Sequence, residues 1–161
     1  MQNIQRISPF LWFDNQAEDA ANFYVSIFKN SKVNKITYYG EAGPGPKGSV
    51  MTVSFELDGQ GFVALNGGAR PDFTESISFM VNCNTQQEVD EYWEKLSAGG
   101  GQEIQCGWLK DKYGLSWQVT PTVLMEMIGD PDPKKSQRVM EAMFQMKKID
   151  IEKIEQAYHI Q

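Results

Sequence analysis

The sequence predicts an α+β fold built from two tandem βαβββ units and a helical C-terminal tail. Both halves contain an apolar strand followed by an amphipathic helix, and aligning Phe13 with Val81 (81 minus 13 gives an offset of 68) also aligns Tyr24 with Tyr92. Each half then ends in a similar hairpin. A duplicated unit of this kind predicts a curved mixed sheet with a cleft where the copies meet.

The first unit is expected over about residues 4–68. The predicted elements are a strand over 7–13, a helix over 17–28 and strands over 33–39, 50–57 and 61–66. The strand over 50–57 has the clearest pattern, because Val53 and Phe55 alternate with polar neighbours. The Gly- and Pro-rich segment 40–48 is expected to be a loop.

The second unit is expected over about residues 74–121, after a linker over 67–71. It is predicted to have a strand over 76–81, a helix ending at Ser97 and strands over 103–109 and 115–120. Thr85 and Glu88 have the spacing of a capping box, which places the start of the helix. Residues 1–121 would therefore form one paired domain.

Residues 122–161 are predicted to form a helical extension, packed on the paired domain or on a dimer partner. Asp132 can cap a helix that has Pro133 in its first turn. A second helix is expected after Asp150, where Ile151 and Ile154 begin an apolar stripe.

Composition excludes several classes of protein. The chain has 161 residues and a net charge of -6, which disfavours nucleic acid as a partner. It has no apolar run long enough to cross a membrane. Cys83 and Cys106 have no Cys-x-x-Cys spacing, so we expect free thiols and a cytoplasmic protein.

Strand alternation identifies candidate ligand-binding residues. Polar residues share faces in three predicted strands, and these faces either line the cleft or face solvent. The candidate cleft residues are Trp12, Ser54, Glu56, Asn66, Ser76, Ser78, Met80, Trp108, Ser116 and Gln118. Trp117 is a further candidate for the cleft wall, with core packing as its alternative.

Residues suited to catalysis are few. Glu56 is the candidate general acid or base, and its alternative role is that of a solvated surface residue. Neither cysteine has a histidine to activate it, since the single histidine, His159, stands near the C-terminus. Nucleophilic catalysis is therefore not expected.

Several longer motifs resemble one family. They are Ser8-Pro9-Phe10-Leu11-Trp12-Phe13, Asn22-Phe23-Tyr24, 62–68, 77–81, 92–100 and 106–118. They are similar to the PhnB-like group of the vicinal oxygen chelate superfamily, which also includes glyoxalase I and bleomycin-resistance proteins. Members of the group commonly have the label 3-demethylubiquinone-9 3-methyltransferase. The resemblance extends over nearly the whole chain, tail included, and implies a glyoxalase-like fold.

The resemblance also implies where a metal would bind. The superfamily's four ligand positions would fall at Ser8 or Pro9, among Ala64, Leu65 and Asn66, at Ser76 and at Gln118. Among these, Gln118 is the one candidate metal ligand, so a catalytic divalent metal is not expected. S-adenosylmethionine is not expected either, because no glycine-rich turn joins a strand to a helix.

The function expected from these observations is the binding of a polar small molecule in the cleft of a PhnB-like homodimer, without a catalytic metal. The alternatives are a metal-dependent lyase or dioxygenase relative with a degenerate site, or the methyltransferase of the family label. Whether the protein is an enzyme stays open at this point.

Overall fold

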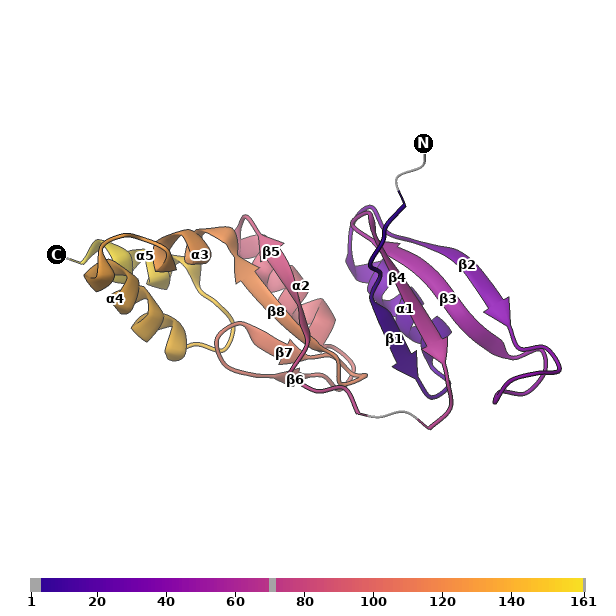
Figure 1. Cartoon of the computed structure of the whole chain (residues 1–161). Coiled ribbons are helices and arrows are strands. Elements are labelled where there is room, and N and C mark those ends of the chain that lie inside the picture. Colours follow the sequence, from indigo (N-terminus) through magenta and orange to yellow (C-terminus); the bar gives the residue numbers. More distant parts are fainter. Residues whose placement is uncertain (1–3, 70–71, 161) are drawn as a thin grey trace. The chain divides into compact units, whose positions relative to one another are not determined.

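The computed structural model describes residues 4–69 and 72–160 (Figure 1). These residues form two four-stranded mixed sheets and five helices, so the predicted α+β fold with two repeated units and a helical tail is confirmed. They fall into two compact units, residues 4–69 (unit 1) and residues 72–160 (unit 2), and the tail is part of unit 2. Arg70 and Pro71 of the predicted linker lie outside the described residues.

Unit 1 has the predicted strand–helix–strand order. Its elements are β1 (Phe10–Phe13), α1 (Ala17–Ile27), β2 (Lys32–Tyr38), β3 (Val50–Leu57) and β4 (Gln60–Asn66). The strand order in the sheet is β1-β4-β3-β2, with β1 parallel to β4 and the other neighbours antiparallel. The first strand is shorter than the predicted 7–13.

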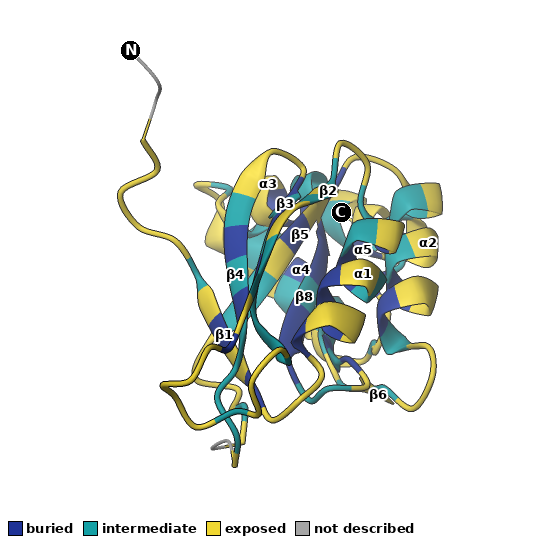
Figure 2. Cartoon of the chain, turned by 90° about the vertical axis from the view of Figure 1, so that its right-hand side faces the viewer, coloured by how far each residue is buried: buried dark blue, intermediate teal, exposed yellow. Residues whose placement is uncertain are grey.

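The core of unit 1 lies between α1 and one face of this sheet. Ala20 and Ala21 of α1 are fully buried, and their small side chains let the helix approach the strands closely. The ring of Phe55 stacks on those of Phe62 and Tyr24, with centroid distances of 5.5 and 6.2 Å. Figure 2 shows buried residues on the inward side of the helix and exposed ones on its outer side.

Unit 2 repeats this arrangement. Its first part contains β5 (Ser78–Cys83), α2 (Gln86–Ser97), β6 (Gln102–Glu103), β7 (Trp108–Lys110) and β8 (Ser116–Pro121), in the sheet order β5-β8-β7-β6. The predicted cap of α2 is confirmed, because Thr85 Oγ1 accepts a hydrogen bond from Glu88 N at 3.2 Å. The Glu88 carboxylate accepts one from Asn84 N at 2.6 Å in return.

The strand predicted over 103–109 is interrupted in the structure. Cys106 has a φ of 60° and Gly107 a φ of 81°, so two successive residues adopt left-handed conformations between β6 and β7. A non-glycine residue in this region costs about 1–2 kcal/mol, which the surrounding contacts must offset. The apolar and polar pattern of this segment gives no sign of the turn.

The tail contains α3 (Thr122–Ile128), α4 (Pro133–Phe144) and α5 (Ile151–His159). The predicted cap of α4 is present, because Asp132 accepts a hydrogen bond from Lys134 N, and Asp150 caps α5 in the same way by accepting one from Lys153 N. A separate apolar cluster holds the three helices together, formed by Leu124, Met127, Val139, Ile149 and Ile154. In the described part of the chain, no helix is long and apolar enough to cross a membrane.

Candidate functional site

The face of the unit 2 sheet opposite α2, here called the outer face, contains the largest group of predicted site residues. Strand pairing places Met80, Gln118 and Trp108 in one row across β5, β8 and β7. Ser78, Ser116 and Lys110 form the next row. Five of the ten predicted cleft residues therefore share one face: Ser78, Met80, Trp108, Ser116 and Gln118.

Ser116 has an unusual environment on this face. Its side chain is fully buried, and its Oγ has no hydrogen-bond partner among the described residues. A buried hydroxyl without a partner costs about 1–3 kcal/mol of folding free energy, which is rare in a native protein without a functional or solvent-related reason. The Ser116 hydroxyl therefore has a hydrogen-bonding capacity that no described residue uses.

Gln118 lies beside this hydroxyl in the sheet. Its Nε2 donates a hydrogen bond to Ser78 Oγ at 2.9 Å, which orients the amide. The neighbouring Met80 is 41% exposed, and the indole of Trp108 is partly buried. The row thus has an oriented amide between a thioether and an aromatic ring.

Lys110 is the charged residue in the Ser116 row, and the sequence did not identify it as a site residue. Its ammonium group forms an ion pair with Glu75, so the charge is compensated. The ammonium of Lys110 holds the pKa of the exposed Glu75 carboxyl below its usual value. The hairpin pairing of 110 with 116 is the signal that would have found Lys110.

The equivalent face of unit 1 is more apolar. One row of this face contains Trp12, Leu65 and Thr52. The pattern of strand pairing makes it equivalent to the row of Met80, Gln118 and Trp108 in unit 2. In the next row, Phe10 and Val63 replace Ser78 and Ser116. The register left open by the sequence is thus determined: Leu65 is the counterpart of Gln118.

Ser54 and Glu56 lie on this same face of unit 1 and contact the edge strand β2. The Glu56 carboxylate accepts a hydrogen bond from Asn34 Nδ2 at 3.0 Å and lies 3.8 Å from Lys32 Nζ. Ser54 Oγ donates to Lys35 O at 3.4 Å. These contacts agree with the alternative role of Glu56 as a surface residue.

The structure places two other candidates away from these faces. Asn66 lies on the helix side of its sheet, where its Oδ1 accepts a hydrogen bond from Ala17 N at 2.8 Å and thereby caps α1. Its Nδ2 donates to Val50 O at 3.2 Å. Ser76 lies in an exposed turn before β5. These two candidates do not join the group on the outer face.

Trp117 belongs to the core, as its alternative interpretation held. Its indole Nε1 donates a hydrogen bond to Asp111 Oδ2 at 2.9 Å, and both residues are almost fully buried. Phe79 packs against its ring at a centroid distance of 5.6 Å. Residue 117 faces α2, because it alternates with the outer-face residues Ser116 and Gln118.

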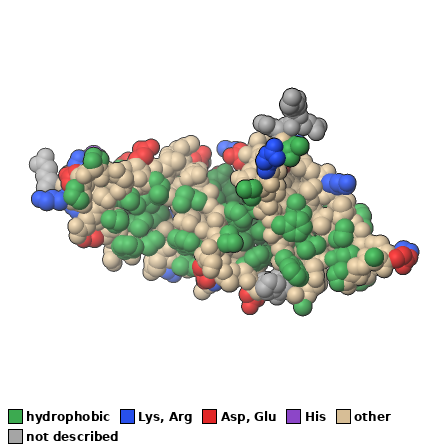
Figure 3. Space-filling model, in the orientation of Figure 1, with side chains coloured by type: hydrophobic (Ala, Val, Ile, Leu, Met, Phe, Trp, Pro, Cys, Tyr) green, Lys and Arg blue, Asp and Glu red, His purple; other side chains and the backbone are tan. Residues whose placement is uncertain are grey.

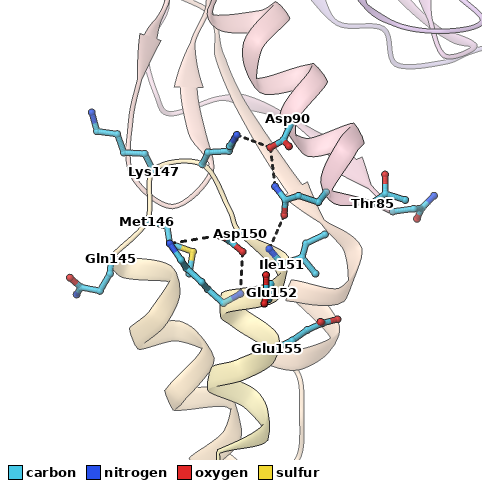
Figure 4. A pocket seen from close by; sticks show the side chains of 13 residues that line it. Thr85, Asp90, Gln145, Met146, Lys147, Asp150, Ile151, Glu152 and Glu155 are labelled. Carbon is cyan, nitrogen blue, oxygen red and sulfur yellow. Dashed lines mark hydrogen bonds and ion pairs between the residues drawn. The ribbon is translucent and has the colours of Figure 1, made fainter.

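A groove of about 870 Å³ lies elsewhere in unit 2, between the start of α2 and the connection from α4 to α5 (Figure 4). Its polar side chains largely pair with one another: Lys148 lies 2.6 Å from Asp90, and Lys153 lies 3.7 Å from Asp150. Gln86 hydrogen-bonds to Asp90 Oδ1 at 3.0 Å. These pairings indicate a structural junction.

The cysteines show little sign of reactivity. Burial, with the nearby Glu88 carboxylate as a smaller cause, raises the pKa of the Cys83 thiol to about 12. Burial also raises the pKa of Cys106, whose side chain is partly exposed. A raised pKa lowers the fraction of nucleophilic thiolate at neutral pH.

We expect a thiol reagent at neutral pH to modify Cys106 in the native protein and Cys83 only after unfolding. Cys83 has a pKa of about 12 in the folded protein, whereas an unfolded thiol has a pKa of about 9. This difference stabilises the folded protein below about pH 9, and the stabilisation is lost as the pH rises from about 9 towards 12. Timed labelling followed by mass spectrometry checks this order, with Cys106→Ser as the control. Labelling of Cys83 in native Cys106→Ser at the rate of an exposed thiol would contradict it.

The residues do not fit the metal centre of the superfamily. Ser8, Leu65, Ser76 and Gln118 occupy the equivalent positions, and Leu65 has no donor atom. No cluster of three or more His, Cys, Asp or Glu side chains suited to a metal occurs within residues 4–69 and 72–160. Glycine is also absent from the segments joining β1 to α1 and β5 to α2, so a typical S-adenosylmethionine turn does not fit.

Comparisons with known proteins identify a single family. Residues 5–120 match the family model described as 3-demethylubiquinone-9 3-methyltransferase. The structure is similar to the PhnB protein from Bacillus cereus, proposed to be a 3-demethylubiquinone-9 3-methyltransferase, at 38% identity and a TM-score of 0.66. That match covers 73% of this chain and 100% of the other. No match was found among curated proteins.

More distant structures share the fold. The protein PA1353 from Pseudomonas aeruginosa is 18% identical, with a TM-score of 0.59 and coverage of 73% of this chain and 98% of that one. The fosfomycin resistance protein FosX from Listeria monocytogenes is 16% identical, with a TM-score of 0.52 and coverage of 76% and 97%. The match to the family model ends at residue 120, so it does not support the expected resemblance of the tail to the family.

Proposed function

The chain belongs to the 3-demethylubiquinone-9 3-methyltransferase family, a PhnB-like group of the vicinal oxygen chelate superfamily, and we propose that its unit 2 binds a neutral, polar small molecule on the outer face. The proposed site contains no metal. The observation that supports the proposal most strongly is the buried, unpartnered hydroxyl of Ser116. A ligand that hydrogen-bonds this group would remove the cost of leaving it unpaired.

The neighbouring side chains support a ligand of this class. Gln118 Nε2 is engaged by Ser78, which leaves Gln118 Oε1 to accept a hydrogen bond from the ligand. Trp108 and Met80 on either side offer polarisable apolar contacts. Since Lys110 is paired with Glu75, the face favours a neutral ligand over an anion.

We propose a site without a metal because the side chains at the superfamily's ligand positions offer few donor atoms. Leu65 occupies the position of unit 1 that is equivalent to Gln118, and it has no donor atom. The amide oxygen of Gln118 alone is a poor ligand set for a divalent cation. Metal analysis of protein purified without chelators tests this. Stoichiometric metal that is lost in Gln118→Ala would overturn it.

We predict that Ser116→Ala leaves the free protein as stable as the natural one, or up to about 1 kcal/mol more stable, because an unpaired buried hydroxyl is removed. The same substitution should abolish stabilisation by a ligand. Thermal unfolding with and without each member of a panel of small neutral amides, alcohols and phenols measures both effects. Ser26→Ala, which removes an exposed hydroxyl from α1, is the matched control.

The panel also decides between the proposed function and its alternatives. Saturable stabilisation that survives in Ser26→Ala and disappears in both Ser116→Ala and Gln118→Ala supports the proposal. Stabilisation that persists in both outer-face variants would place the ligand elsewhere. S-adenosylmethionine is included in the panel, and saturable stabilisation by it would favour the methyltransferase.

The homodimer and the cytoplasmic location stay predictions from the sequence. Hydrophobic side chains are visible on the surface of the tail (Figure 3), where Phe144 is 60% exposed. Sedimentation analysis over a range of concentrations measures the state of association. A monomer at all concentrations would contradict the dimer without affecting the proposed ligand site.

A further inference from the structure

The connection between α4 and α5, residues 145–150, hydrogen-bonds directly to the turn that precedes the outer-face residue Trp108. Cys106 N donates to Met146 O at 2.8 Å, and Gly107 N donates to Lys147 O at 2.7 Å. These two donors belong to the residues in left-handed conformations. The 145–150 connection lies beyond residues 5–120, the part of the chain that the family model matches.

Gly107 links this connection to the strand that contains Gln118. Its carbonyl oxygen accepts a hydrogen bond from Val119 N at 2.8 Å. A Cβ at position 107 would lie 2.9 Å from Val119 O and 3.2 Å from Ile149 Cγ1, so the residue fits closely between β8 and the connection. Ile149 is fully buried, which fixes one side of the contact.

The same turn determines the position of Trp108. Trp108 N donates to Gln105 O at 3.1 Å, and Ile104 N donates to Trp108 O at 2.9 Å. Trp108 then pairs with Gln118 across β7 and β8. The conformation of Cys106 and Gly107 therefore sets how Trp108 meets Gln118 on the outer face.

The connection is in turn held by the first turns of α2. Gln86 Nε2 donates to Ile149 O at 3.1 Å, and Gln86 Oε1 accepts from Ile151 N at 2.8 Å. Lys148 forms an ion pair with Asp90 at 2.6 Å. In Figure 4, dashed lines connect Asp90 to Ile151 through the amide side chain that hydrogen-bonds to both.

We propose that the 145–150 connection is a positioning element for the outer face, and that it holds the strained turn at Cys106–Gly107 and thereby the placement of Trp108 opposite Gln118. A left-handed non-glycine residue persists only where its surroundings over-determine it. The two carbonyl groups of the connection supply that restraint. The proposal rests on the proposed ligand site, but its test needs no ligand.

The test is Gln86→Leu in the full chain, which removes the hydrogen bonds of Gln86 to Ile149 O, Ile151 N and Asp90 Oδ1 at similar side-chain size. Gln87→Leu is the matched control, because Gln87 is an exposed neighbour in the same helical turn. We expect hydrogen exchange at the Cys106 and Gly107 amides of Gln86→Leu to accelerate about tenfold or more. We also expect the NMR signals of the Trp108 indole and the Gln118 side-chain amide to shift, while those of β5 and of the control stay unchanged.

A purely structural role would give a different result. If exchange at Cys106 and Gly107 accelerates while the Trp108 and Gln118 signals stay in place, the positioning role is overturned. Unchanged exchange at both amides overturns it as well. Should Gln86→Leu fail to fold, Asp90→Asn, which breaks the ion pair with Lys148, is judged by the same two signals. Failure of the ligand panel would count against the proposed function and leave these criteria intact.

Discussion

Phe55→Ala is expected to lower the free energy of unfolding of unit 1 by about 4 kcal/mol. Phe55 is fully buried at the centre of the contact between α1 and the sheet, where its ring stacks on Phe62 and Tyr24. Alanine would leave a cavity that the surrounding rings cannot fill without moving the helix. The strand hydrogen bonds around position 55 hold the backbone in place, which limits any collapse of the cavity.

Phe10→Ala is the matched control, because Phe10 is a phenylalanine of the same sheet that is 57% exposed. It should change stability by about 0.5 kcal/mol or less. Native-state hydrogen exchange at the amides of β3 measures the loss in unit 1, and exchange at β8 reports on unit 2. A loss below about 1.5 kcal/mol for Phe55→Ala would show that the core repacks, contrary to the expectation.

Asp111→Asn is expected to destabilise unit 2 by about 3 kcal/mol. Asp111 is almost fully buried, and its carboxylate accepts hydrogen bonds from Tyr113 N at 2.9 Å, Leu115 N at 3.1 Å and Trp117 Nε1 at 2.9 Å. The amide of asparagine has one oxygen, so a donor NH₂ group must face one of these three donors. An interaction that holds the hairpin and the indole together is thereby replaced by an unsatisfied contact.

Glu126→Gln removes a carboxylate from an exposed position of α3 and serves as the control. Urea unfolding followed by tryptophan fluorescence measures both variants, since Trp117 is the partner of Asp111. The control should stay within about 0.5 kcal/mol of the natural protein. Equal stability of the two variants would mean that the three hydrogen bonds to Asp111 contribute no net stability.

Local sequence patterns predicted most of the fold. The alternation around Phe55 gave the bounds of β3, and the Thr85–Glu88 spacing gave the start of α2, because both features depend on neighbours in sequence. The turn at Cys106–Gly107 was missed, because backbone and side-chain groups of residues 146–149 stabilise it from far along the chain. Such a contact leaves no periodic signal near position 106.

The candidate site was predicted in part for the same reason. Alternation along a single strand placed Ser116 and Gln118 on one face, as the structure has them. Asn66 has a polar amide of the kind that often binds ligands, yet this amide caps α1. That role depends on where the helix begins relative to β4, which the residue type does not indicate. The equivalence of Leu65 with Gln118 needed the pairing between strands, which the sequence of one strand does not contain.

The irregular pairing of β2 bears on how the protein behaves at high concentration. This edge strand shifts register against β3 twice, between Val33 and Lys35 and between Thr37 and Tyr38, and Lys32 and Lys35 lie along it. A regular, uncharged edge would offer its free peptide groups to the edge of another molecule, which is the first step of ordered aggregation. Bulges and lysines on an edge oppose that growth, so β2 is an unfavourable template for the edge of another molecule.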